Sequence, residues 1–155
     1  MKIKLNILFH LLILTSCNKK ETSSKFDWTD ISIRNSYEEI IVYKDLDTAS
    51  FIKPIYENID GNIFAMKLIR VDRKRIKFTQ SEKDSIAHYV LQIIKNPVEL
   101  NIYCTDYVGN LNVKISNSNL ALSANYKSVC QVDTISAETK KLFKLLNSRI
   151  NFADN

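Results

Sequence analysis

Glycine and histidine are both scarce in this chain of 155 residues, which holds two of each. Loops that bind nucleotide phosphates need glycines so that the backbone can approach the ligand, and neither G-x-G-x-x-G nor G-x-x-x-x-G-K-S/T occurs. His10 lies in the N-terminal segment, and His88 falls on the polar side of a predicted helix, where we expect it to face solvent. The sequence therefore offers no Ser-His-Asp arrangement, no G-x-S-x-G turn and no cofactor site.

An excess of one charge is also missing from most of the chain. The formal net charge is +5, but five of the lysines precede Phe26, accompanied there only by Glu21. From Phe26 onward there are 17 basic and 16 acidic side chains. A nearly neutral domain lacks the basic footprint of a protein that binds DNA or RNA, so we expect no nucleic-acid partner.

The N-terminal segment has the three-part layout of a secretory signal peptide. Lys2 and Lys4 precede an apolar run from Ile7 to Leu14, and two small polar residues then lead to Cys17. The run is much shorter than the roughly 20 apolar residues that a membrane-spanning helix needs. We therefore expect a cleaved targeting segment rather than a permanent transmembrane anchor.

Leu14-Thr15-Ser16-Cys17 resembles the lipobox of bacterial lipoproteins, which has an aliphatic residue, two small residues and the cysteine that receives the lipid. The resemblance implies cleavage before Cys17, a diacylglycerol thioether on its sulfur and acylation of the new N-terminus, for example with palmitate. Two or more acyl chains hold a protein firmly on a membrane. The resulting division is a signal peptide over 1–16, a lipidated cysteine and polar tether over 17–25, and one domain over 26–155.

The residues after Cys17 bear on the membrane that the lipid would enter. Asn18 takes the place of the aspartate that retains some lipoproteins in the inner membrane, and Asn18-Lys19-Lys20 lacks the acidic run typical of surface-exported lipoproteins. We therefore expect the cell envelope as location, with the protein anchored in the outer membrane and facing the periplasm.

Two cysteines, Cys104 and Cys130, remain in the expected exported domain. An even pair in that compartment favours a disulfide, which would close a loop of 26 positions and contribute about 3 kcal/mol. Two buried thiols are the alternative. A zinc site is disfavoured, because two cysteines without C-x-x-C spacing and one histidine fall short of four ligands. We expect no metal.

Two helices can be read from capping residues and apolar spacing. Thr79 with Glu82 three residues later forms a capping-box signature, and the helix that it begins ends at Asn96-Pro97. A second helix begins after Ser136, with Glu138 in its first turn. The expected apolar faces contain Ile86, Tyr89, Val90, Ile93 and Ile94 in the first helix and Leu142, Phe143, Leu145, Leu146 and Ile150 in the second.

Alternating polar and apolar residues predict strands in the remainder of the domain. Asp60-Gly61 predicts a hairpin, Pro54 indicates that its first strand lies at an edge or is interrupted, and Asn117–Asn119 predicts another turn. The expected strands are Thr29–Ile33, Glu39–Tyr43, Phe51–Ile59, Asn62–Val71, Leu100–Cys104, Leu111–Ser116 and Leu120–Tyr126. This order predicts an α+β fold: a single antiparallel sheet with two helices packed on one face.

One basic cluster interrupts the pattern between the second hairpin strand and the first helix. We expect it to form a solvated turn, and contact with anionic lipid head groups or an acidic protein partner is the alternative. Its members are Arg70, Arg73, Lys74, Arg75 and Lys77. The stretch Leu68–Asp72, a basic turn and Thr79–Ile86 opening a helix is similar to small lipoproteins of uncharacterised activity from Bacteroidota-type bacteria, a resemblance that implies no activity.

Carboxylates offer little evidence for catalysis. Asp45 and Asp47 could begin a calcium loop, but Ala49 and Ser50 stand where that loop needs an acidic or amide residue and a glycine. Glu38 and Glu39 are adjacent on a strand and would point to opposite faces. A hydrolase would need a deep pocket that holds at least two of Glu39, Asp45, Asp47, Glu57 and Asp106.

Three functions remain open at this point. The leading hypothesis is a non-enzymatic binding module on a lipid tether, such as an inhibitor, an immunity factor or an assembly accessory, which holds an envelope protein through an exposed, tyrosine-bearing sheet face. The alternatives are an envelope hydrolase that uses carboxylates and a module that holds a small ligand or lipid in an apolar cavity between the sheet and the helices.

Overall fold

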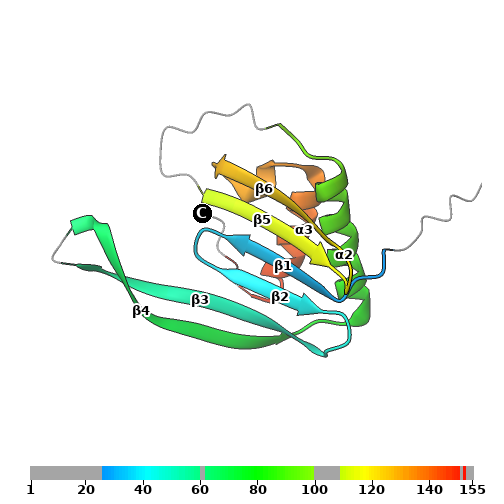
Figure 1. Ribbon diagram of the computed structural model, residues 1–155, viewed down its shortest axis with the longest axis horizontal. Coiled ribbons are helices and arrows are strands. Elements are labelled where there is room, and N and C mark those ends of the chain that lie inside the picture. The colour runs from blue at the N-terminus through cyan, green and yellow to red at the C-terminus, as the bar shows by residue number, and fades with distance from the viewer. Residues whose placement is uncertain (1–25, 60–61, 100–108, 151, 153–155) are drawn as a thin grey trace, which may run out of the picture.

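The structure is a computed structural model that describes residues 26–59, 62–99, 109–150 and 152. Within these ranges six strands form one antiparallel sheet in the order β4-β3-β2-β1-β5-β6 (Figure 1). The strands are β1 (Asp30–Asn35), β2 (Glu39–Tyr43), β3 (Thr48–Ile59), β4 (Asn62–Lys77), β5 (Gly109–Ser116) and β6 (Ala121–Val129). The predicted α+β class with a single antiparallel sheet is confirmed.

The centre of the sheet is built from β1 and its neighbours β2 and β5. Ile31 and Ile33 of β1 are fully buried, whereas Ser32 between them lies on the opposite face, as the two-residue period of a strand requires. The residue pattern predicts a strand at Thr29–Ile33 but does not identify its neighbours in the sheet. Its central position depends on pairing with β5, about eighty residues later in the chain.

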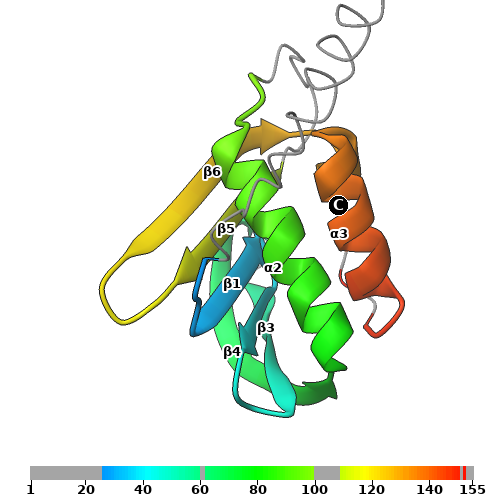
Figure 2. The ribbon, with the colours of Figure 1, turned by 90° about the vertical axis from the view of Figure 1, so that its right-hand side faces the viewer.

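Two helices pack on one face of this sheet and contact β5 and β6 (Figure 2). Helix α2 spans Gln80–Lys95 and α3 spans Ala137–Asn147, and a short 3-10 helix, η1 (Val132–Thr134), precedes α3. Both predicted N-caps are present, and each forms a full capping box: Thr79 with Glu82, and Ser136 with Thr139. α2 has Asn96 as its C-cap, as predicted.

The core lies between the helices and the sheet. α2 buries Ile86, Val90 and Ile93, and α3 buries Leu142, Phe143 and Leu146. Phe152 packs against Phe143, with ring centroids 5.6 Å apart, and against Phe51 of β3 at 6.2 Å. Burying one such large apolar side chain is worth roughly 1.5–3 kcal/mol. The contacts of Phe152 tie the end of the chain to the part of the sheet that the helices do not cover.

Several strand boundaries differ from the sequence prediction. β4 continues to Lys77, so the expected strand end at Val71 is wrong. Leu120, which we expected inside a strand, belongs to the Asn117–Leu120 turn and is 50% exposed. The hairpin expected at Asp60-Gly61 is confirmed by the pairing of β3 with β4. The expected strand Leu100–Cys104 lies outside the described residues.

Candidate interaction surface

The hairpin of β3 and β4 continues past the rest of the sheet as an arm (Figure 1). The last residue of β3 that pairs with β2 is Ile52, opposite Glu39, whereas β3 itself runs on to Ile59. We define the arm as residues 53–59 of β3 and residues 62–72 of β4. At about 3.3 Å per residue it extends roughly 20 Å beyond the other strands.

Apolar side chains are exposed mainly on this arm. Nine large hydrophobic side chains are exposed among the described residues, and six of them belong to the arm. The six, each between 39% and 56% exposed, are Tyr56, Ile59, Met66, Leu68, Ile69 and Val71. Single exposed apolar residues are ordinary on protein surfaces, whereas a concentration of them makes the arm a candidate interaction site.

A β-bulge determines which face of the arm these residues share. Ile55 pairs with Arg70 and Tyr56 pairs with Leu68, so Ile69 is the extra residue on β4. If the residues of β4 alternated regularly from Val71 without a bulge, Leu68 and Met66 would lie on the helix-side face. The bulge instead places them on the outer face with Val71, away from the helices. The bulge thus gathers three exposed apolar side chains on one side of β4.

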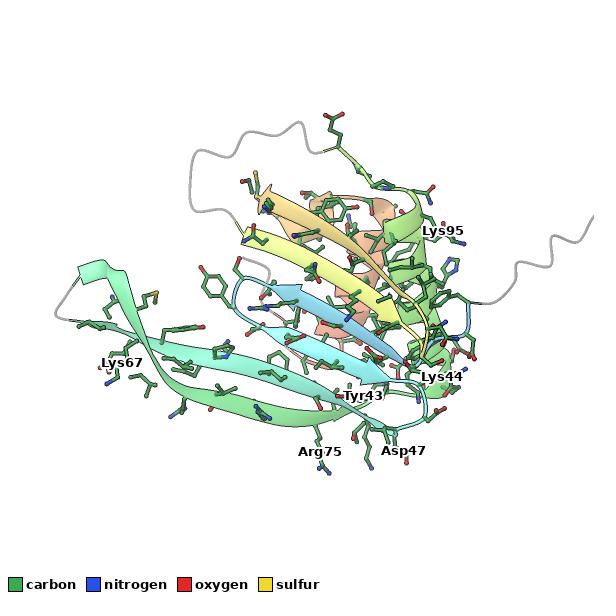
Figure 3. The ribbon with its side chains drawn as sticks, viewed as in Figure 1. Tyr43, Lys44, Asp47, Lys67, Arg75 and Lys95 are labelled. Carbon is green, nitrogen blue, oxygen red and sulfur yellow. The ribbon has the colours of Figure 1, made fainter. Side chains whose placement is uncertain are left out.

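Basic side chains continue the same face of β4 beyond the base of the arm. Arg73, Arg75 and Lys77 follow Val71 at two-residue spacing, and all three are exposed. Figure 3 shows Lys67 far out on the arm and Arg75 beside the body of the sheet. We call this row the β4 stripe; its six residues, in order from the arm to the body, are Met66, Leu68, Val71, Arg73, Arg75 and Lys77.

The expected solvated turn at the basic cluster is therefore wrong. All five basic residues lie in β4, where alternation divides them between two faces: Arg73, Arg75 and Lys77 face outward, whereas Arg70 and Lys74 lie on the helix side. Arg70 donates from Nε to Oδ1 of Asp72 at 3.0 Å, an exposed pair of small energetic value. The cluster forms a stripe because strand geometry places every second residue together.

A hollow of about 530 Å³ lies on the helix side of the arm's base, between β3, β4 and the segment after α3. Glu38 is fully buried at its wall, and Lys53 Nζ lies 2.6 Å from Glu38 Oε1. The Asn35 side chain accepts the backbone N–H groups of Tyr37 and Glu38 and so shapes the turn into β2. A buried carboxylate is tolerated when it is paired in this way, so the pair fixes the root of the arm.

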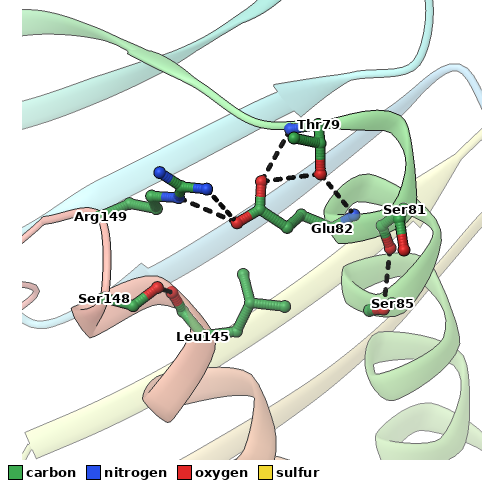
Figure 4. A network of polar contacts seen from close by, with 7 residues as sticks. All are labelled: Thr79, Ser81, Glu82, Ser85, Leu145, Ser148 and Arg149. Carbon is green, nitrogen blue, oxygen red and sulfur yellow. Dashed lines mark hydrogen bonds and ion pairs between the residues drawn. The ribbon is translucent and has the colours of Figure 1, made fainter.

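A polar network joins the start of α2 to the end of α3 beside this hollow (Figure 4). Glu82 accepts from the Thr79 backbone at 2.7 Å and from Arg149 Nη2 at 2.6 Å. The Thr79 N–H, with Arg149 as a further donor, lowers the pKa of Glu82, against the opposing effect of desolvation. Arg149 also lines a second hollow of about 320 Å³, together with Asp47 and Lys77.

The outer face of the sheet carries a third, polar hollow of about 640 Å³ at the end of β1. Arg34, Asn112 and Asn125 lie directly opposite one another on β1, β5 and β6. Asn110 and Lys127 complete the row across the bulge at the start of β5. Two cations and several amides could hold a polar or anionic group. The Ser36 hydroxyl also lines this hollow and accepts the backbone N–H of Asn110, and no carboxylate or histidine is among the lining residues.

No protein-family model, curated protein or solved structure matches this chain.

The carboxylates that we expected in a hydrolase site are dispersed. Glu39 accepts from Ser32 Oγ at 2.7 Å on the outer face, opposite to buried Glu38 as predicted. Asp47 borders the smallest of the three hollows, and Glu57 is exposed on the arm. Asp45 is exposed as well, and Asp106 lies outside the described residues. None of the three hollows brings two of these carboxylates together.

The remaining predicted site residues have different outcomes. His88 is exposed on α2, as expected. Cys130 follows β6, but Cys104 lies outside the described residues, so their disulfide stays a prediction, as does lipidation of Cys17. In the part of the chain that the structure describes, no three His, Cys, Asp or Glu residues cluster to hold a metal, and no helix is long and apolar enough to cross a membrane.

Sequence reasoning missed two features. Lys83 is buried on α2, where its Nζ donates to the backbone oxygens of Lys44 at 2.5 Å and Leu46 at 3.2 Å. The signal was its spacing, since it stands three residues before Ile86 on the apolar face. The bulge also had a signal: Leu68 and Ile69 are adjacent apolar residues in a strand that otherwise alternates.

Proposed function

We propose that this chain is a lipid-anchored protein of the cell envelope that acts as a non-enzymatic binding module, and that the β3–β4 arm holds an envelope protein. The proposal keeps the tether inferred from the lipobox at Cys17. It moves the binding surface from the general sheet face to the arm. An inhibitor, an immunity factor or an assembly accessory would each use such a surface.

The observation that carries the proposal is the concentration of exposed apolar side chains on the arm. Fully covering a leucine- or methionine-sized side chain is worth roughly 1.5–3 kcal/mol, and a few central apolar anchors typically supply most of the energy of an interface. Met66, Leu68 and Val71 lie in a row on one face, with Tyr56 directly opposite Leu68. The arm can therefore present a preformed set of anchors.

The position of the arm suits a tethered protein. Asp30 begins β1 at the end of the sheet opposite the arm, close to where the chain enters the domain at Phe26 (Figure 1). β1 and β3 both run away from that end, so the arm points away from the point of attachment. An arm in this position would be available to a partner while the lipid holds the other end of the protein.

The experiment is a pull-down of the tagged, full-length protein from its own envelope after mild crosslinking, followed by mass spectrometry. Leu68→Asp places a charge at the centre of the apolar part of the stripe. Leu120→Asp is the matched control, because Leu120 is 50% exposed and Leu68 is 49% exposed. We expect a protein that wild type and Leu120→Asp recover in equal amount and that Leu68→Asp loses. Equal recovery by all three proteins would contradict the proposal.

A further inference from the structure

We propose that the outer edge of β4 is the site at which an acidic, extended segment of the partner adds to the sheet as a seventh strand. The inference rests on the proposed function and specifies the chemistry of the partner. Addition of a strand to an open edge uses backbone hydrogen bonds for affinity and alternate side chains for specificity.

The outer edge of β4 has no neighbouring strand within the described part of the chain. β4 is the first strand in the order β4-β3-β2-β1-β5-β6, and no described strand pairs with its outer side. At sixteen residues it is also the longest strand described, well above the usual five or six. A long open edge leaves a row of backbone donors and acceptors without sheet partners, which makes it a template for another strand.

The opposite edge of the arm is less suitable. β3 also lacks a neighbour beyond Ile52, but Pro54 lies just past that point. Proline has no N–H group and cannot donate to an added strand. β4 contains no proline between Asn62 and Lys77. The backbone chemistry therefore directs strand addition to β4.

The charge of β4 selects an acidic partner and disfavours a second copy of this chain. Between Met66 and Lys77 there are six basic side chains and one carboxylate. Pairing two copies along this edge would bring two strongly cationic segments together, and like charges on adjacent strands repel. Glutamates at every second position of an added strand would instead lie beside Arg73, Arg75 and Lys77. Apolar residues in its other half would lie beside Met66, Leu68 and Val71.

A lipid surface fits the arm less well than a protein strand does. Glu57 and Asn58, both exposed, lie near the end of β3, so the outer part of the arm carries a carboxylate and an amide. Inserting that end into a bilayer would bury charge, which is unfavourable in hydrocarbon. The apolar side chains line the flank of the arm instead, where a strand can lie along them.

The test uses the full chain, purified in detergent, and a labelled synthetic peptide. Every second residue of the peptide is glutamate in one half and valine in the other, with threonine between them; a matched peptide has lysine for glutamate. We expect the glutamate peptide to bind more tightly by on the order of tenfold, as three cross-strand charge pairs would give. Arg73→Glu with Arg75→Glu should remove that preference, and Lys127→Glu on β6 should not.

Amide hydrogen exchange then shows whether the peptide adds as a strand. Protection should increase along β4 on binding and stay unchanged along β6, the other edge of the described sheet. The inference would be overturned if the two peptides bound equally or not at all, or if protection increased outside β4. It would also be overturned if the protein bound phosphatidylglycerol vesicles in preference to the glutamate peptide, or if it sedimented as a dimer. If Leu68→Asp still abolishes capture of an envelope protein in that case, the proposed function stands without it.

Discussion

Lys83 shows how a single residue joins distant parts of the chain. Its buried ammonium group donates to two carbonyls in the turn between β2 and β3. Lys83→Met keeps most of the volume but leaves both carbonyls without this donor, so we expect the free energy of unfolding to fall by about 1–3 kcal/mol. Urea denaturation measures this, with Lys141→Met on the exposed face of α3 as the control, expected within about 0.5 kcal/mol of wild type. If Lys83→Met and Lys141→Met lower the free energy of unfolding by the same amount, the two hydrogen bonds of Lys83 contribute nothing to stability.

Glu82 should make stability depend on pH. Because the Thr79 N–H and Arg149 lower its folded pKa, its stabilising contribution is complete above the ordinary glutamate pKa and is lost as the pH falls through the lowered value. Glu82→Gln should therefore cost about 1 kcal/mol near neutral pH, and the difference from wild type should shrink in acid. Denaturation at a series of pH values tests this, with Glu57→Gln on the arm as the control. A difference that is constant with pH would contradict the assignment.

Local residue patterns predicted some elements well and others poorly. The N-caps at Thr79 and Ser136 act within one turn, so the sequence contains the information needed to find them, although the capping box of Ser136 with Thr139 was not part of the prediction. The length of β4 could not be found in this way, because alternating arginines and lysines have the composition of a solvated turn. Only pairing with β3, from Thr48 opposite Lys77 to Ile59 opposite Asn62, makes these residues a strand.

The bulge gives the most specific prediction for a structural element. Deleting Ile69 removes the extra residue, so Arg70 and Leu68 become neighbours opposite Ile55 and Tyr56, and Leu68 and Met66 stay on the outer face. We expect the deletion variant to retain capture of the envelope partner, while circular dichroism stays that of a folded protein. Ile69→Val keeps the extra residue and should also retain capture. A folded deletion variant that no longer captures the partner would show that Ile69 or the bulge itself, rather than the shared face of Leu68 and Met66, carries the binding.

At the scale of the whole molecule, the proposed function gives separate roles to the N-terminal tether and to the arm. The lipobox resemblance predicts that Cys17→Ser leaves the protein without lipid. Metabolic labelling with palmitate should mark the wild type and not this variant, and fractionation should find the variant outside the membrane pellet. Cys130→Ser is the control and should remain lipidated. Palmitate label on Cys17→Ser would contradict the anchor.

The strand order was the least predictable property of the whole molecule. β1 pairs with β2 next to it in the chain and with β5 after α2, and no local signal in Asp30–Asn35 identifies the second neighbour. The position of the arm follows from the same non-local pairing. Because β2 begins only at Glu39, opposite Ile52, the rest of β3 and its partner residues of β4 extend alone. The candidate surface therefore becomes visible only in three dimensions.

The most direct measurement is photo-crosslinking in the intact envelope, with a photoreactive amino acid at position 68 in one protein and at position 120 in another. These leucines are nearly equally exposed, so the comparison isolates location. We predict that position 68 yields one dominant protein adduct and that position 120 yields none. Adducts of equal pattern and yield at both positions, or adducts to lipid alone at position 68, would contradict a role of the arm in binding an envelope protein.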